Sequence, residues 1–158
     1  MKSLVLFYSR TGTTRRLAGA IGEALAADIC EIRCPRYGPG AWSYVRAGYD
    51  SLKGNLPIID ALDVDPAQYD LVLLGCPVWT SYPATPMRAY LAQRPALPAT
   101  VGGFVTLGGQ SPAAKTFDLM GEALGRPLAA TLALKADDMA GTDLKDIIAP
   151  FLERLSPL

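Results

Sequence analysis

A short loop near the start of the chain, residues 9–14, concentrates groups that could hold a phosphate. It consists of Ser9, Arg10, Thr11, Gly12, Thr13 and Thr14. Hydroxyls donate hydrogen bonds, and the unpaired amides and dipole at a helix N-terminus both favour negative charge. Capping a helix would need only one of the four hydroxyls. These residues therefore predict an anion-binding loop rather than a simple helix cap.

The elements around this loop must place it at a sheet edge. Residues 4–7 are apolar without alternation, which predicts a strand buried on both faces, as in a parallel sheet. After the loop, Leu17, Ile21, Ala24 and Leu25 recur at the spacing of one helix face. We therefore expect the loop to join the carboxyl end of a buried strand to the start of a helix.

Several classes of site are excluded by what the chain lacks. The loop has neither the Gly-Lys-Ser/Thr ending of a Walker loop nor the three glycines of a dinucleotide fingerprint. The chain contains no histidine, so catalytic triads that use one are impossible. Cys30, Cys34 and Cys76 lack paired Cys-x-x-Cys spacing, which argues against a zinc site or a disulfide framework and favours a reducing cytoplasm.

Length and composition predict one globular domain over residues 1–158. Half of the residues are apolar and no run of eighteen apolar residues occurs, so we expect neither a membrane span nor a secretory signal. Fifteen basic and fifteen acidic residues leave no net charge, which argues against nucleic acid or an anionic membrane as a partner. We expect a monomer or a homodimer.

A second candidate loop follows the predicted strand at residues 71–75. Its two prolines stiffen it, and its aromatic residues offer flat faces for a planar ligand. We expect one side of such a ligand to be lined by Pro77, Val78, Trp79, Thr80 and Tyr82. The alternative is that Trp79 packs into the core. Residues 78–81 contain no glycine, which predicts against left-handed backbone there.

A third candidate loop, residues 106–111, follows the predicted strand at residues 101–106. Its paired glycines permit close approach of the backbone to a ligand, although they also suit an ordinary strand-to-helix turn. We expect this loop to line the other side of the ligand through Thr106, Leu107, Gly108 and Gly109.

The rest of the chain alternates predicted strands with predicted helices. Further strands are expected at residues 28–33 and 128–136. Such alternation predicts an α/β fold, a doubly wound five-stranded parallel sheet with helices on both faces. Helices are expected to begin at Thr85, at residues 111–112 and near Thr142, with Pro150 bending the last one or shifting its start. A stripe of Trp42, Val45, Tyr49 and Leu52 has helical spacing and is interpreted as core packing.

Residues 5–21 resemble the N-terminal signature of the flavodoxin family. The residues on its fixed positions are Phe7, Ser9, Gly12, Thr14, Ala18 and Ile21. Gly-x-Pro-x-Trp at residues 75–79 and the later glycine pair extend the resemblance to short-chain, flavodoxin-like proteins. The resemblance implies a sheet order of 2-1-3-4-5 and bound flavin mononucleotide (FMN). It implies that the 5′-phosphate lies in the first loop and the ring between the other two.

Two departures from that family bear on function. Electron-carrying flavodoxins are acidic and stack a second aromatic residue on the flavin, whereas this chain has Leu107 there and no acidic residue between Asp70 and Asp118. A site without carboxylates would accept an anionic nicotinamide or a quinone. We expect an FMN-binding redox protein that transfers electrons to a partner protein or small acceptor. The alternatives are an NAD(P)H-dependent quinone or flavin oxidoreductase and a flavin-free regulatory module, and no side chain is nominated as catalytic.

Overall fold

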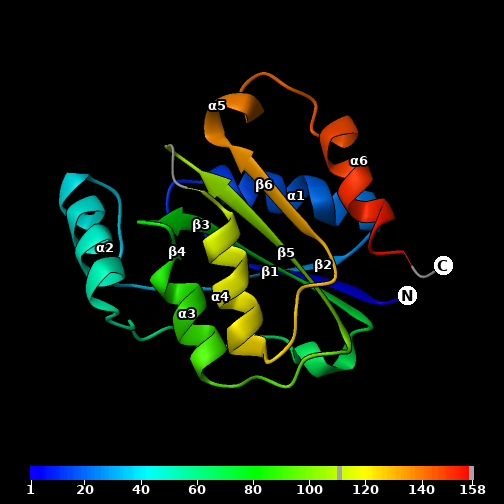
Figure 1. Ribbon diagram of the computed structural model, residues 1–158, viewed down its shortest axis with the longest axis horizontal. Coiled ribbons are helices and arrows are strands. Elements are labelled where there is room, and N and C mark those ends of the chain that lie inside the picture. The colour runs from blue at the N-terminus through cyan, green and yellow to red at the C-terminus, as the bar shows by residue number, and fades with distance from the viewer. Residues whose placement is uncertain (110–111, 157–158) are drawn as a thin grey trace.

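The computed structural model describes residues 1–109 and 112–156, and its centre is a twisted parallel sheet (Figure 1). The parallel strands are β1 (Ser3–Phe7), β2 (Asp28–Glu31), β3 (Leu71–Trp79), β5 (Thr100–Leu107) and β6 (Thr131–Lys135). Their order is β2-β1-β3-β5-β6, so the predicted 2-1-3-4-5 order of five parallel strands is confirmed. A two-residue strand, β4 (Tyr82–Pro83), was not predicted and pairs antiparallel with the end of β3.

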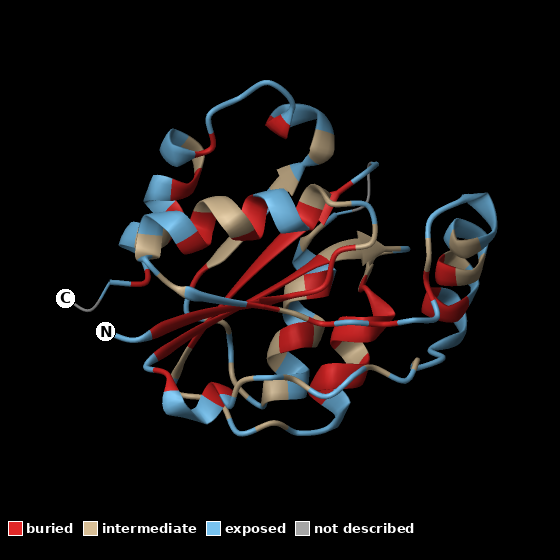
Figure 2. Cartoon of the chain, turned by 180° about the vertical axis from the view of Figure 1, so that it is seen from behind, coloured by how far each residue is buried: buried red, intermediate tan, exposed pale blue. Residues whose placement is uncertain are grey.

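Helices cover both faces of the sheet because alternate residues of each buried strand point to opposite faces. Leu4 and Leu6 of β1 join the core on the side of α3 (Thr85–Ala92) and α4 (Ala114–Leu124). Val5 and Phe7 join the core under α1 (Thr13–Leu25) and α6 (Lys145–Glu153). Figure 2 shows the resulting buried layer of strands between the two sets of helices.

Helix α2 (Ala41–Lys53) stands at the side of the molecule, and its packing contradicts the prediction for its apolar stripe (Figure 1). The predicted core residues Trp42, Val45, Tyr49 and Leu52 are all exposed. The face that α2 buries carries small and polar residues instead, namely Ala47, Asp50 and Ser51. Buried polar contacts, described below with the site, override the apolar periodicity and set the orientation of this helix.

Smaller differences concern element ends. Ala24, predicted on the buried face of α1, is exposed. Helix α3 begins at Thr85, as predicted, and the Thr85 hydroxyl pairs with that of Tyr37. Helix α4 begins at Ala114. Its predicted start was at residues 111–112, of which Ser111 lies outside the described residues. Helix α6 begins at Lys145, which places Pro150 inside it. Short elements are the 3₁₀ turn Pro66–Gln68 and α5 (Ala136–Met139).

The three cysteines are free and buried, and Cys30 packs as a small apolar residue of β2. Burial raises the pKa of the Cys76 thiol to about 12, so this thiol stays protonated and unreactive at neutral pH. Across residues 1–109 and 112–156, none of the helices has the length and apolar character needed to cross a bilayer.

Candidate functional site

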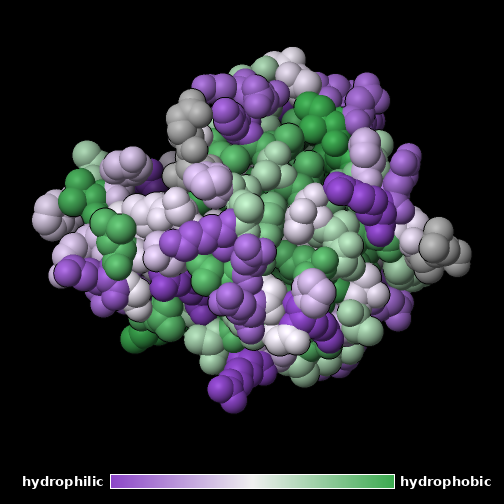
Figure 3. Space-filling model, in the orientation of Figure 1, coloured by the Kyte–Doolittle hydropathy of each residue, from purple (hydrophilic) through white to green (hydrophobic). Residues whose placement is uncertain are grey.

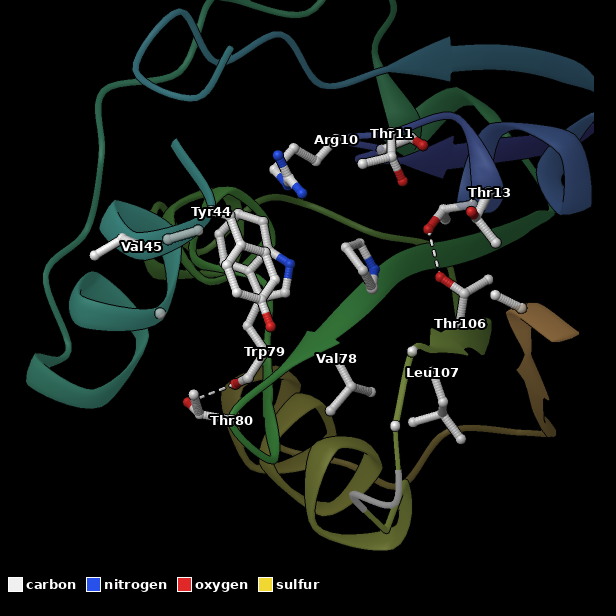
Figure 4. Close-up of a pocket in the computed structure, with 18 of the residues that line it drawn as sticks. Arg10, Thr11, Thr13, Tyr44, Val45, Val78, Trp79, Thr80, Thr106 and Leu107 are labelled. Carbon is white, nitrogen blue, oxygen red and sulfur yellow. Dashed lines mark hydrogen bonds between the residues drawn. The ribbon is translucent and has the colours of Figure 1, made fainter. Parts of the chain in front are cut away.

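A cleft of about 670 Å³ lies at the carboxyl ends of β1, β3 and β5 (Figure 4). It brings together thirteen of the fifteen predicted site residues. These are Ser9, Arg10, Thr11, Thr13, Thr14, Pro77, Val78, Trp79, Thr80, Thr106, Leu107, Gly108 and Gly109. Segments far apart in the sequence meet here because parallel strands end at the same edge, on either side of the point where the chain reverses its direction of winding.

The loop after β1 presents free amides to this cleft. Gly12 adopts φ of +101° as the residue before α1, and its N–H donates to Ser9 Oγ at 3.1 Å. The N–H groups of Thr13, Thr14 and Arg15 donate no hydrogen bond to any residue that the structure describes. No acidic side chain lies in the first turn of α1. The start of α1 is therefore an unneutralised helix N-terminus, with donors available for an anion.

Gly12 itself does not line the cleft, although it was predicted as a site residue. Its contribution is the backbone conformation, because φ of +101° is disfavoured for residues with a Cβ. A Cβ built on Gly12 would meet only Arg15 Nη1, at an ordinary 3.5 Å. Glycine is therefore required here by the backbone angle and not by a lack of space.

A buried pair of hydroxyls joins the first and third loops. Thr14 Oγ1 and Thr106 Oγ1 lie 2.7 Å apart, although 92 residues separate them in the sequence (Figure 4). Both side chains are almost fully buried. The pair fixes the start of α1 against the end of β5. The loop at residues 9–14 and the glycine-pair loop are therefore held in a fixed position relative to each other.

Trp79 lines the cleft and also packs against the core side, so the two interpretations of this residue are compatible. Its indole contacts the rings of Tyr8 and Tyr37 edge-on, with centroids 5.7 and 5.1 Å away. Tyr82, by contrast, does not line the cleft. The Lys115 ammonium and the Arg88 guanidinium lie over its ring, 4.2 and 5.2 Å from the centroid.

The turn between β3 and β4 is left-handed at two residues without glycine. Thr80 and Ser81 have φ of +51° and +71°, so the prediction against left-handed backbone in this loop was wrong. Such a two-residue turn matches the right-handed twist of a hairpin. Ser51 Oγ donates to the Trp79 carbonyl at 2.6 Å, and Thr116 Oγ1 donates to the Ser81 carbonyl at 3.2 Å. These bonds from α2 and α4 hold the turn in its strained form.

Helix α2 supplies a wall of the cleft that the sequence interpretation missed. The additional lining residues are Tyr44, Val45, Ala47, Gly48, Tyr49 and, from α5, Ala136. The Arg10 guanidinium lies 5.6 Å from the centre of the Tyr44 ring, which connects the phosphate-loop candidate to α2 across the cleft. The sequence did offer one sign that α2 is not an ordinary core helix. The face opposite its apolar stripe carries Ala47, Asp50 and Ser51, which are too small or too polar to form an apolar core.

A buried carboxylate anchors α2. Asp50 accepts hydrogen bonds from Arg36 Nε at 2.6 Å, Tyr37 Oη at 2.7 Å and Asn55 Nδ2 at 3.2 Å. The Arg36 guanidinium and these donors lower the pKa of the Asp50 carboxyl to about 2, so it stays ionised although fully buried. Burial, together with the bond to this carboxylate, raises the pKa of Tyr37 to about 12.

The electrostatics of the cleft favour an anion. None of the described residues that line it carries a carboxylate, and Arg10 contributes a positive charge. With the free amides of α1, these features give the site a positive potential.

Comparisons with known proteins agree with this geometry. No protein-family model matches the chain, and no curated protein matches it. The chain is similar to a Lactobacillus acidophilus flavoprotein solved in complex with FMN, at 27% identity and a TM-score of 0.70, covering 87% of this chain and 94% of that one. It is also similar to a candidate flavoprotein from Bacteroides eggerthii, at 22% identity and a TM-score of 0.80, covering 99% of each chain.

A third solved neighbour is an NADH:FMN oxidoreductase in its apo form, at 14% identity and a TM-score of 0.57, covering 98% of this chain and 87% of that one. The fold and these neighbours confirm the resemblance to flavodoxin-like flavoproteins. The chain has a flavodoxin-like fold.

Proposed function

We propose that the chain is a redox protein that binds FMN in the cleft at the carboxyl ends of β1, β3 and β5. The observation that carries this proposal is the unneutralised start of α1, whose free amides and hydroxyls face a cleft with otherwise apolar and aromatic walls. A phosphate dianion suits the first feature, and a flat, largely apolar ring suits the second. The FMN complex of the Lactobacillus acidophilus flavoprotein supports the same ligand.

The predicted residues divide into two roles. The hydroxyls of residues 9–14, the amides at the start of α1 and the Arg10 guanidinium would hold the phosphate. The ring would lie between residues 77–80 and residues 106–109, with Tyr44 and Tyr49 of α2 bordering the entrance. Bound FMN accepts and donates one or two electrons, and the protein supplies binding, orientation and a positive field. No side chain is assigned a catalytic role.

An oxidoreductase acting on small molecules is the second candidate, and the absence of carboxylates from the described lining favours it. An anionic nicotinamide or a quinone could approach Arg10 and the aromatic wall without like-charge repulsion. The first candidate remains a carrier that exchanges electrons with a protein partner. The three free, buried cysteines support a reducing compartment, which we propose to be the cytoplasm.

Binding of FMN and riboflavin to the flavin-free protein tests the proposal. Riboflavin lacks the phosphate, so it should bind at least about tenfold more weakly than FMN, because one charge-assisted hydrogen bond contributes about 1.5–3 kcal/mol. Quenching of flavin fluorescence measures both affinities. Equal affinities would contradict the phosphate assignment, and no binding of either flavin would favour the flavin-free module.

Turnover separates the two redox candidates. The FMN-loaded protein is mixed with NADPH and a soluble quinone without any partner reductase, and NADPH oxidation is followed by absorbance. Steady turnover supports the oxidoreductase. Reduction that occurs only when a flavoprotein reductase is added supports the electron carrier.

A further inference from the structure

Helix α2 leaves its apolar side exposed, although two residues of that side, Val45 and Tyr49, also line the cleft. Trp42, Val45, Tyr49 and Leu52, here called the outer stripe, have exposed fractions of 72%, 57%, 58% and 70%. In the hydropathy view, hydrophobic residues appear on the outside of the molecule at the α2 end (Figure 3). Amphipathic helices of globular proteins ordinarily direct such a stripe at the core. The outer stripe is therefore an apolar surface with no partner among the described residues.

The network around Asp50 prevents the helix from turning the outer stripe inward. Asp50 is fully buried and lies on the opposite face, where Arg36, Tyr37 and Asn55 donate to it. Rotating α2 would break these bonds and bring the apolar stripe against a polar cluster. Separating a buried carboxylate from its partners is strongly unfavourable. The outward orientation of the stripe is thus a fixed property of the fold.

The outer stripe is about as large as the largest apolar patch on a typical monomer. Aromatic side chains cover about 150–250 Å² each, so the exposed parts of the four side chains leave on the order of 500 Å² of mostly apolar surface. The largest apolar patch on a typical monomer is about 300–600 Å² and is often functional. A stable interface takes about 800 Å² from each partner, so the stripe could supply most of one side.

We propose that the outer stripe is covered by the outer stripe of a second copy of this chain, in a two-fold symmetric homodimer. A two-fold interface uses the same patch on both copies, and the stripe meets that requirement. Trp42 and Leu52 lie ten residues apart, about 15 Å along the helix. Antiparallel packing of two α2 helices would therefore place the bulky Trp42 of each copy against the smaller Leu52 of the other.

Charge favours a second copy over other occupants. The chain has fifteen basic and fifteen acidic residues, so two copies do not repel each other through net charge, and proteins near zero net charge associate readily. The charged residues of α2 besides the buried Asp50 are Arg46 and Lys53. Anionic membranes are bound by clusters of about four to eight basic residues, which this helix does not offer.

The second copy in the dimer would lie next to the entrance of the cleft. Val45 and Tyr49 belong both to the outer stripe and to the lining of the cleft, so the second copy would border its entrance. Each copy would then narrow the entrance of the other copy's cleft. Trp42 and Leu52 lie outside the lining of the cleft, so the proposed dimer does not depend on FMN being the ligand.

Sedimentation equilibrium tests the proposal on the full chain, from micromolar to sub-millimolar concentration. We expect a reversible dimer of the 16.8-kDa chain. Leu52→Glu would place a carboxylate in the apolar interface and should weaken dimerisation at least about 100-fold. Ile58→Glu makes the same change at an exposed apolar residue outside α2, and should leave the dimer unchanged.

Two results would overturn the proposal: a monomer at every concentration, or equal dimerisation by wild type and Leu52→Glu. Circular dichroism checks that the variants fold, and Trp42→Arg replaces Leu52→Glu in the test if Leu52→Glu does not fold. A monomer whose tryptophan emission shifts to the blue with phosphatidylglycerol vesicles, but not with phosphatidylcholine vesicles, would assign the stripe to a membrane surface instead.

Discussion

The two walls of the cleft are held in place by different forces. The loop after β1 is positioned by a strand in which every side chain is buried, and the loop itself is closed by the hydrogen bond from Gly12 N–H to Ser9 Oγ. The opposite wall, α2, contributes few apolar contacts and is anchored by the ionised Asp50. One wall therefore depends on the apolar core of the sheet, while the other depends on one charged network that can be removed or titrated.

The largest effect is expected from removing the anchor of α2. Asp50→Ala leaves Arg36, Tyr37 and Asn55 without their acceptor, so the free energy of unfolding should fall by about 2–4 kcal/mol. Urea unfolding at neutral pH measures the change. Asp60→Ala is the matched control, because Asp60 is exposed and its loss should cost less than about 0.5 kcal/mol. Equal stabilities of the two variants would contradict the role of Asp50 as an anchor.

Acid should loosen the same wall without any mutation. The folded protein holds the pKa of Asp50 at about 2, below its ordinary 3.8, so ionised Asp50 stabilises the folded state. This contribution, on the order of 2 kcal/mol, is complete above about pH 4 and is lost as the pH falls from about 4 to about 2. Unfolding free energies over that range should fall less steeply for Asp50→Asn than for the wild type. If the unfolding free energies of the two proteins fell in parallel, the acid sensitivity would come from other carboxyls, which would contradict the role of Asp50.

A pair of glycines compares the two walls directly. Gly12 directly precedes α1 and has φ of +101°, and Gly40 directly precedes α2 and has φ of +107°. Alanine at either position should cost about 1–2 kcal/mol of stability through backbone strain, since neither site is crowded. Only Gly12→Ala should also weaken FMN binding, by roughly tenfold, because its strain distorts the phosphate loop. Fluorescence titration measures this, and an equal loss of affinity in Gly40→Ala would contradict the distinction.

The same contrast explains what could be predicted from the sequence. The apolar run of residues 4–7 and the hydroxyl-rich loop after it depend on local order, so strand, loop and cleft edge followed directly. The orientation of α2 could not be predicted in this way, because the spacing of Trp42 and Leu52 is the same whether the stripe faces inward or outward. Only a tertiary contact decides, and Arg36 meets Asp50 from outside the helix.

The prediction against a left-handed turn after β3 was wrong for a similar reason. Residue preferences disfavour positive φ at Thr80 and Ser81, but hydrogen bonds from Ser51 and Thr116, on two separate helices, outweigh the preference. The sequence distance between donor and turn made these bonds invisible to local patterns. Short β4 was missed because it exists only as the return arm of that turn.

A smaller effect should separate direct from indirect roles of Thr14. Thr14→Ala removes a hydroxyl from the phosphate loop and should weaken FMN binding by about two- to tenfold. Thr106→Val breaks the same buried hydroxyl pair from the far side, without altering residues 9–14. Isothermal titration with FMN compares them. A larger loss in Thr14→Ala supports contact with the phosphate, whereas equal losses would mean that Thr14 acts only by holding α1 against β5.

The smallest expected effect is a gain in stability at the strained turn. Glycine adopts positive φ without the cost that a side chain adds, and it is the preferred second residue of this hairpin turn. Ser81→Gly should relieve about 1–2 kcal/mol of strain but lose part of that gain to the greater freedom of glycine in the unfolded chain, for a net stabilisation of about 0.5–1 kcal/mol. Thr80→Gly should gain less, because it also removes the 2.7 Å contact between the Thr80 and Ser51 hydroxyls. Urea midpoints at unchanged slope measure both variants. A destabilised Ser81→Gly would mean that the turn is not left-handed in solution, and that α2 and α4 do not hold it strained beside the cleft.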